Sequence, residues 1–181
     1  MSTCTIRPIR ADEWWEVRAL RLEALGDEAA PLAFGESYDE GAAMPDSFWR
    51  ERAAGSSVDA GPDAGARQLV AVAEDGRWVG TSVVLVESAG DKDFEGRVVE
   101  RSGGHVVGVF VSPQHRAAGV IDGLFEASLG WMRSRGLPWA RLYVHEENAR
   151  AQGAYRRCGF EPTGLRLDGS LGREIEMART V

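Results

Sequence analysis

The sequence predicts an α/β domain spanning residues 1–181, with helices packed on the faces of a mixed sheet. Three observations indicate this class. The hydrophobic fraction of 44% and the charged fraction of 27% are ordinary for a globular chain. Residues 105–111, HVVGVFV, form a nearly continuous apolar run, as in a strand buried on both faces. Segments with strand and helix periodicity follow one another in the order β, α, α, β, β, β, α, β, α, β, β.

Local signals justify each element in turn. Strands are predicted over residues 5–9, 68–73, 78–87, 105–111 and 139–145, and in two final segments flanking a turn at 168–172. Helices are predicted from Ala11 to Gly26, from a cap at Asp46 or Ser47, from Gly119 to the stop at 136–138, and over 148–158. The Asp75-Gly76 pair is the strongest hairpin signal. Residues 55–66 and 88–97 are predicted to be loops because they are polar or rich in turn residues.

The charge distribution restricts the partners. A net charge of −7 disfavours nonspecific binding to nucleic acid or to an anionic membrane surface. Residues 113–160 nevertheless carry seven basic and four acidic side chains, a balance of +3, so the rest of the chain carries −10. This asymmetry suits an anionic cofactor bound next to a cationic substrate, and chance variation of a solvated surface explains it about as well.

Cysteine content and hydropathy indicate the cellular compartment that we expect. Cys4 and Cys158 are the only cysteines, so neither a disulfide framework nor a zinc site of four thiolates is expected, and we predict no metal. The first ten residues contain no apolar signal region. No apolar run approaches the roughly 20 residues that span a bilayer. These features predict a reduced, cytoplasmic protein without a membrane partner.

The first motif is a strand, a short loop and a helix over residues 109–124, VFVSPQHRAAGVIDGL. The small residues Ala117, Ala118 and Gly119 let a ligand approach the backbone closely. The first N–H groups of a helix have no internal partners, so they form an anion site, to which Arg116 adds a charge suited to phosphate. This spacing fits a diphosphate. Small polar residues are also common in any strand-to-helix turn, so the motif alone does not decide the function.

The second motif, residues 142–164, places Asn148 at a helix start, Tyr155 near the helix end, and Gly159 with Phe160 as its C-cap. Asn148 could merely cap and Tyr155 merely pack. The two motifs occur together in one order, however, and together they resemble the cofactor-binding motifs of the GNAT N-acetyltransferase superfamily. The matching positions are Val111, Pro113, Arg116, Gly119, Asn148, Ala151, Tyr155, Gly159 and Phe160. Ile121 departs from the family pattern, which has a small residue there.

The resemblance implies a mostly antiparallel sheet of six to seven strands with a splayed central parallel pair, flanked by about four helices. It implies that acetyl-CoA binds between the strands ending near Val111 and His145. Strand backbone would pair with the pantetheine arm, and N–H groups from Arg116 to Ile121 would hold the pyrophosphate. The implied cofactor-binding residues are Val109, Phe110, Val111, Arg116, Ala117, Ala118, Gly119, Val120, Ile121, Asn148 and Tyr155. The side chain of Ile121 must point into the core, or it would crowd the cofactor.

The implied chemistry is direct attack of an amine on the thioester. A strand N–H near Val111 would hold the oxyanion, and the resemblance assigns Tyr155 the role of donor to the departing thiolate. A base must also deprotonate the ammonium. His105 is the candidate because its ordinary pKa of about 6.5 lies near neutrality, and Glu100 is the next. Glu146 and Glu147 could line the amine entrance or simply be solvated.

We therefore predict an acetyl-CoA-dependent N-acetyltransferase that acts on a primary amine of a small molecule or peptide. The alternative is a non-catalytic acyl-CoA-binding or sensor module of the same fold, which Ile121 and the lack of a decisive base would favour. The acceptor pocket is expected from the first two helices, the 88–97 loop and the final hairpin. The sequence leaves the oligomeric state open, including a homodimer.

Overall fold

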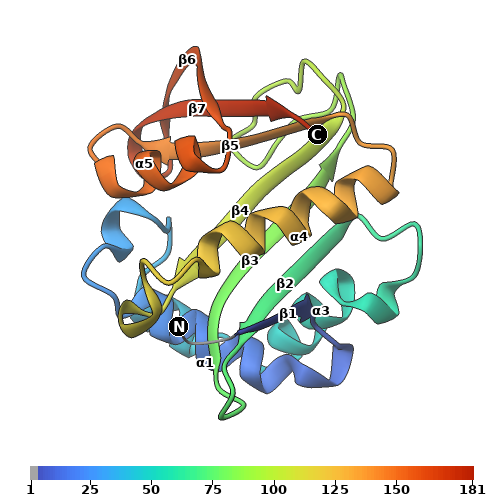
Figure 1. The fold of residues 1–181 in the computed structure, drawn as a ribbon, viewed down its shortest axis with the longest axis vertical. Coiled ribbons are helices and arrows are strands. Elements are labelled where there is room, and N and C mark those ends of the chain that lie inside the picture. Colours follow the sequence, from blue (N-terminus) through green and yellow to red (C-terminus); the bar gives the residue numbers. More distant parts are fainter. Residues whose placement is uncertain (1–3) are drawn as a thin grey trace.

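A seven-stranded sheet organises the fold (Figure 1). The computed structural model describes residues 4–181, with strands β1 (Thr5–Pro8), β2 (Ala66–Val72), β3 (Trp78–Glu87), β4 (Gly103–Val111), β5 (Trp139–His145), β6 (Glu161–Gly169) and β7 (Gly172–Thr180). The strand order is β1-β2-β3-β4-β5-β7-β6. Only β4 and β5 run parallel; the other pairs formed by these strands are antiparallel. The predicted mostly antiparallel sheet with a central parallel pair is therefore confirmed.

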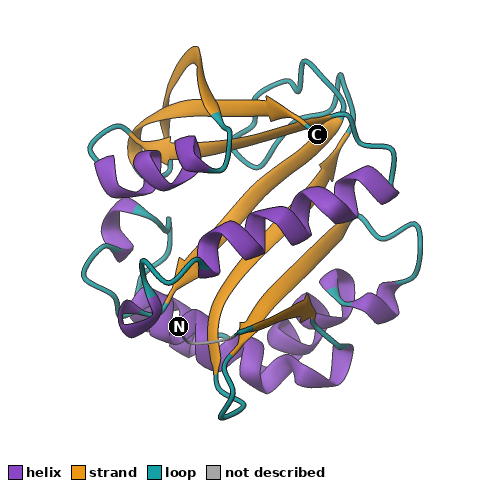
Figure 2. Cartoon of the chain, viewed as in Figure 1, coloured by secondary structure: helices purple, strands orange, loops and turns teal. Residues whose placement is uncertain are grey.

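Helices cover both faces of the sheet (Figures 1 and 2). They are α1 (Trp14–Leu25), α2 (Tyr38–Ala43), α3 (Asp46–Ser56), α4 (Val120–Ser134) and α5 (Ala149–Arg157), with a 3-10 turn, Ala11–Glu13, before α1. The residues described thus contain five α-helices where about four were predicted. The additional helix is α2, which has only six residues and begins with a capping box between Ser37 and Glu40.

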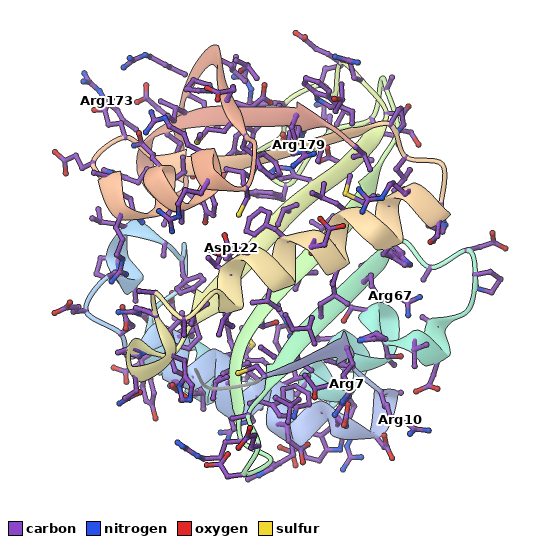
Figure 3. The ribbon with its side chains drawn as sticks, viewed as in Figure 1. Arg7, Arg10, Arg67, Asp122, Arg173 and Arg179 are labelled. Atoms are coloured by element: carbon purple, nitrogen blue, oxygen red, sulfur yellow. The ribbon has the colours of Figure 1, made fainter. Side chains whose placement is uncertain are left out.

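Successive side chains of β2 point to opposite faces of the sheet, so the sheet separates the core into two parts. Val70 packs with α1 and α3, whereas its neighbours Leu69 and Ala71 pack with α4 on the opposite face. Arg67 points to the α4 face as well (Figure 3). Its guanidinium lies 5.3 Å from the ring centroid of Trp131. Within residues 4–181, no helix combines the length and the apolar character that crossing a bilayer requires.

The central parallel pair is joined at one end only. β4 and β5 pair at Gly104 with Ala140 and at His105 with Arg141, and nowhere beyond. Gly103 is needed at this junction because a Cβ there would overlap the carbonyl oxygen of Trp139. Further along β4, Gly108 has a φ of 61° and lies in a β-bulge against β3. The bulge bends β4 away from β5, and the two strands open toward their carboxyl ends.

Local signals located most element ends. The hairpin at Asp75 and Gly76 is confirmed, and the N–H of Arg77 donates to Asp75 Oδ1 at 3.0 Å. The predicted cap of α3 at Asp46 or Ser47 is wrong. Pro45, in an extended conformation, is the N-cap, and Asp46 lies in the first turn, where the helix dipole favours a carboxylate. The predicted 55–66 loop is shorter, because α3 continues to Ser56 and residues 58–60 form a 3-10 turn.

Candidate functional site

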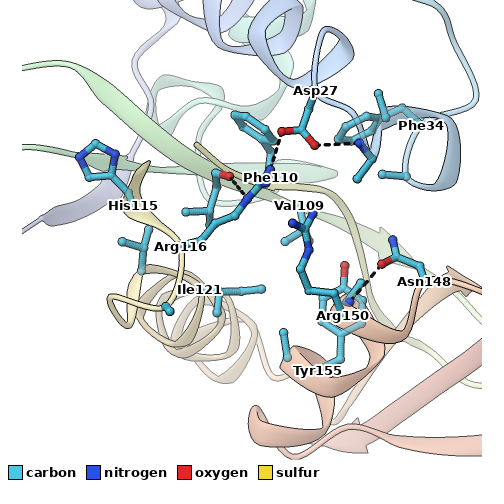
Figure 4. Close-up of a pocket in the computed structure, with 18 of the residues that line it drawn as sticks. Asp27, Phe34, Val109, Phe110, His115, Arg116, Ile121, Asn148, Arg150 and Tyr155 are labelled. Atoms are coloured by element: carbon cyan, nitrogen blue, oxygen red, sulfur yellow. Dashed lines mark hydrogen bonds and ion pairs between the residues drawn. The ribbon is translucent and has the colours of Figure 1, made fainter. Parts of the chain in front are cut away.

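A cavity of about 270 Å³ lies where β4 and β5 separate, and we call it the β4–β5 cavity (Figure 4). Its wall comes from the end of β4, the start of α4, helix α5 and the segment after α1. The predicted cofactor-binding residues that line it are Val109, Phe110, Val111, Arg116, Ala117, Val120, Ile121, Asn148 and Tyr155. Ala118 and Gly119 belong to the same loop without lining the cavity. The two sequence motifs, residues 109–124 and 142–164, therefore meet around one space.

The loop before α4 presents backbone donors. Ala117 and Gly119 have φ values of 60° and 77°, so a left-handed residue stands on each side of Ala118, and alternating backbone conformations of this kind can form an anion-binding concavity. The N–H of Gly123 is the first to bond within the helix, to the carbonyl of Gly119 at 3.1 Å. Among the described residues, the N–H groups of 117–122 have no hydrogen-bond partner. Free N–H groups at the positive end of a 15-residue helix suit a phosphate.

Arg116 is fixed by two partners that the sequence did not reveal. Its Nε donates to the carbonyl of Val111 at 3.0 Å, and its Nη2 lies 2.6 Å from Asp27 Oδ2 (Figure 4). Burial alone would raise the pKa of Asp27, but hydrogen bonds from Ala29 N–H and from Arg116 hold it below its ordinary value. The ion pair therefore persists at neutral pH. It ties the segment after α1 to the loop before α4.

The cavity has an excess of positive charge. Arg150 and Arg157 of α5 line it together with Arg116 and His115, while Asp27 is the one acidic side chain in its wall among residues 4–181. Arg150 lies at the mouth between α5 and the loop before α4 (Figure 4). Three of the seven basic side chains of residues 113–160 thus lie in the wall of this cavity.

The exposed edge of β4 offers backbone groups to the cavity. The N–H of Ser112 donates to the carbonyl of Val79 at 2.8 Å, so Ser112 pairs toward β3. Because successive residues of a strand direct their backbone groups to opposite edges, the N–H of Val111 points toward the opening between β4 and β5. β5 has no partner for it, since the parallel pairing ends at His105.

Asn148 and Tyr155 take the positions that their motif predicts. Asn148 caps α5, with Oδ1 accepting from the N–H of Ala151 at 3.1 Å, and its Nδ2 donates to the carbonyl of Leu32 at 3.4 Å. Tyr155 is 9% exposed and packs against Phe125 with ring centroids 5.4 Å apart. Burial, and secondarily Cys158, raise the pKa of the Tyr155 phenol, so its O–H stays protonated at neutral pH. It is a hydrogen-bond donor in the wall of the cavity.

A second hollow, of about 580 Å³, lies along β4, and we call it the β4–β7 hollow. Ala33 and Phe34 belong to the walls of both spaces. β4 contributes residues 105–108 to the hollow and residues 109–111 to the cavity, so the two spaces meet at the bulge. The other walls come from α3, β2, β3, Tyr143 of β5, and the β6–β7 hairpin, which provides Ser170, Leu171 and Glu174.

His105 belongs to the wall of the hollow and has no exposed surface. Its Nδ1 lies 2.9 Å from Glu87 Oε1, and its ring packs against Phe94 and Tyr143 with centroids 4.9 and 4.8 Å away. Its Nε2 is buried and has no hydrogen-bond partner within residues 4–181. The structure brings Glu100 to neither space: it is exposed near Trp139, on a different part of the surface.

An ion-pair network surrounds His105. Arg141 is 2.8 Å from Glu87, 2.9 Å from Asp93 and 3.0 Å from Glu176. Burial would raise the pKa of Glu87 and Asp93, but hydrogen bonds from His105, Tyr143 and Arg141 hold both pKa values low. Ligand atoms of Glu87, Asp93 and His105 lie within 4.8 Å of one another, a spacing that a metal could use. Arg141 already balances both carboxylates, so the cluster is better described as an ion-pair network.

Sequence reasoning missed three residues that the structure places in these walls. Asp27 is 89 residues from its partner Arg116, and no motif marks it. Arg150 appeared only in the charge balance. Glu174 is a buried carboxylate in the final hairpin, and nothing in its sequence neighbourhood predicts burial. Ile121, which stands where the family pattern has a small residue, is partly buried against the core and also lines the cavity. Its side chain therefore narrows the cavity without closing it.

Comparisons with known proteins agree with this geometry. Residues 29–160 match the acetyltransferase (GNAT) family. A mycothiol acetyltransferase of Saccharomonospora viridis is 39% identical over 87 residues, which cover 48% of this chain and 27% of that protein. One from Beutenbergia cavernae is 30% identical over 153 residues, 77% of this chain and 51% of that protein. The chain thus spans about half the length of these relatives at most.

A solved structure shares the fold over nearly the whole chain. It is a PaiA N-acetyltransferase from Thermoplasma acidophilum in complex with coenzyme A, with a TM-score of 0.72 and 16% identity over 99% of each chain. At this identity the likeness concerns the fold alone. The family match covers most of the chain, however, and it includes the first motif and residues 142–160 of the second. The chain therefore belongs to the acetyltransferase (GNAT) family.

Proposed function

We propose that this chain is an acetyl-CoA-dependent N-acetyltransferase that transfers the acetyl group directly to a primary amine in a ternary complex. The observation that carries the proposal is the convergence around one cavity of three features: unpaired N–H groups at the start of α4, an unpaired edge of β4, and the protonated Tyr155. These are a site for phosphate, a site for an extended chain, and a proton donor. A thioester of coenzyme A needs all three.

In this proposal the β4–β5 cavity binds acetyl-CoA. The N–H groups of 117–122 hold the pyrophosphate, with Arg150 and Arg157 adding positive charge. Arg116 positions this loop, since its ion pair with Asp27 and its bond to Val111 leave it less free to fork onto phosphate. The pantetheine arm runs along β4 at Val109–Val111 as an added strand would. The thioester then lies near the bulge, beside the β4–β7 hollow.

The reaction follows from this placement. The amine enters through the β4–β7 hollow and loses a proton to a base, and its nitrogen lone pair attacks the thioester carbon. The N–H of Val111 donates to the developing oxyanion. When the tetrahedral intermediate collapses, the C–S bond breaks and the O–H of Tyr155 protonates the departing thiolate. The nitrogen then loses its second proton, which restores the Tyr155 hydroxyl. His105, the base expected from the sequence, has a free Nε2 in the hollow wall, and Phe94 would have to move for an amine to reach it.

The test is thiol release from acetyl-CoA with a panel of amines: polyamines, aminoglycosides, amino acids, peptides and the unacetylated form of mycothiol, for which the relatives are named. We expect at least one amine to accelerate thiol release and to gain an acetyl group by mass spectrometry. The second candidate, an acyl-CoA-binding or sensor module without turnover, is favoured by Ile121 in the cavity wall. It predicts tight acetyl-CoA binding with no amine-dependent thiol release.

A further inference from the structure

Glu174 of β7 holds a carboxylate in the wall of the β4–β7 hollow. The residue is 4% exposed, and its Oε2 is buried without a hydrogen-bond partner among residues 4–181. A Cβ on Gly169 would overlap this oxygen, so the glycine in the facing strand makes room for the carboxylate. A buried carboxylate oxygen left without a donor is costly, and such groups are often retained for binding or catalysis.

The groups around Glu174 do not neutralise it. The carboxylate of Glu95 lies beside it, since a Cβ on Gly169 would also come within 3.3 Å of the Glu95 carboxyl carbon. Both the N–H and the hydroxyl of Ser170 donate to the Glu95 carboxylate. His145 stands opposite Glu174 in β5, with its Nδ1 accepting from the N–H of Glu147. Across the sheet from β7, β4 contributes the buried His105.

Charged side chains farther around the hollow come from other elements. Arg21 of α1 pairs with Glu36 at 2.7 Å. Glu51 and Arg52 of α3 line the hollow and are exposed, and Arg141 and Tyr143 of β5 are engaged in the ion-pair network. On the outer side of Glu174, Arg166 and Arg173 lie within 3.5 Å of Glu146. Asp168 of β6 borders the same outer recess as Glu174. No cation among residues 4–181 forms an ion pair with Glu174.

This arrangement fits an ammonium group. A primary amine is protonated near neutral pH, and it must lose one proton before its lone pair can attack. An unpaired carboxylate in the wall of the acceptor space can attract the cation and accept that proton. Burial, and then the charge of Glu95, raise the pKa of Glu174 to about 7, close to the value at which a base works best at neutral pH. His105 lacks exposed surface, and Glu100 lies elsewhere.

We propose that Glu174 binds the ammonium group of the acceptor in the β4–β7 hollow and accepts its proton, directly or through one water. The N–H proton passes to the carboxylate, the lone pair that remains forms the new C–N bond, and the protonated Glu174 releases its proton to solvent after the product leaves. The proposal rests on the N-acetyltransferase function and deepens it by naming the base and the cationic nature of the acceptor.

The test compares Glu174→Gln with the unchanged enzyme, using an amine that the panel identifies. We measure kcat/KM from pH 5.5 to 9 and plot the ratio of the two enzymes, in which the titration of the amine itself cancels. The kcat/KM of the unchanged enzyme divided by that of Glu174→Gln should be small at low pH. It should rise through about pH 7 to roughly 100-fold or more, because only the unchanged enzyme has a carboxylate that loses its proton in this range. Affinity for acetyl-CoA, measured by calorimetry, should stay within about threefold.

Matched variants separate this role from its neighbours. Glu51→Gln removes an exposed carboxylate from the same hollow, and His145→Gln removes the imidazole opposite Glu174; both should keep the wild-type pH profile. Glu174→Asp keeps a carboxylate, so its kcat/KM should still rise with pH, at a lower overall rate. This variant replaces Glu174→Gln if that variant does not fold. A flat ratio, or a rise with pH that disappears with His105→Gln instead, overturns the role of Glu174 while the function stands. Absence of thiol release by the unchanged enzyme with every amine overturns both.

Discussion

Tyr155→Phe is expected to lower kcat by about 100-fold or more while leaving the KM for acetyl-CoA within a few-fold. The variant keeps the ring that packs against Phe125 and loses only the hydroxyl. Because the raised pKa keeps that hydroxyl protonated, its loss removes the donor for the departing thiolate. General acids contribute typically 10²–10⁴-fold to a rate. Steady-state kinetics with the identified amine measure the change.

A second tyrosine provides the control. Tyr38 of α2 is 49% exposed and lines neither space, so Tyr38→Phe should leave both kinetic constants unchanged. Unchanged turnover in Tyr155→Phe would mean that the hydroxyl takes no part in the reaction and that the ring only packs. A loss of acetyl-CoA affinity at constant kcat would make Tyr155 part of the binding wall instead.

Arg141→Met should produce the largest loss of stability, a fall of about 3–5 kcal/mol in the free energy of unfolding. The methionine fills much of the space but leaves Glu87, Asp93 and Glu176 without their shared cation. The side chains of Arg141 and Asp93 are 8% and 0% exposed, so water does not replace the lost partner. Chemical denaturation at pH 7 measures the difference.

The stability loss in Arg141→Met should depend on pH. The ion pairs hold the pKa values of Glu87 and Asp93 below their unfolded values, so they stabilise the fold above about pH 4, and this contribution disappears as pH falls through the lowered values. The gap between Arg141→Met and the unchanged protein should therefore be largest at neutral pH and narrow in acid. Arg133→Met, which breaks the exposed pair with Glu126, should change stability by less than about 1 kcal/mol. A similar effect of both substitutions would contradict the account.

The fold was largely predictable because its signals are local. The apolar run at 105–111, the Asp75-Gly76 turn and the periodicity of α4 each depend on residues close together in the chain. Helix α2 was missed because a six-residue helix carries too short a period to be distinguished from a loop. The cap of α3 was misplaced by one or two residues, since proline, aspartate and serine all occur at helix starts.

The site was predictable only where motifs mark backbone geometry. The loop 116–121, Asn148 and Tyr155 came from such motifs, and the structure gathers them around the cavity except for Ala118 and Gly119. Burial and long-range pairing left no such signal. The ring of His105 is enclosed by Phe94 and Tyr143, and the partner of Arg116 lies 89 residues away. Glu174 becomes buried only when β7 pairs between β5 and β6.

Calorimetric titration with acetyl-CoA tests the central claim, that the β4–β5 cavity binds the co-substrate. Ala151 lines this cavity, whereas Gly153 on the same helix does not, and a Cβ at Gly153 would meet no atom within 4 Å. Ala151→Trp should fill the cavity and weaken binding at least 10-fold, while Gly153→Trp, which introduces the same side chain, should bind as the unchanged protein does. Absence of binding by the unchanged protein at high micromolar concentration, or equal affinity in the two tryptophan variants, would contradict the account.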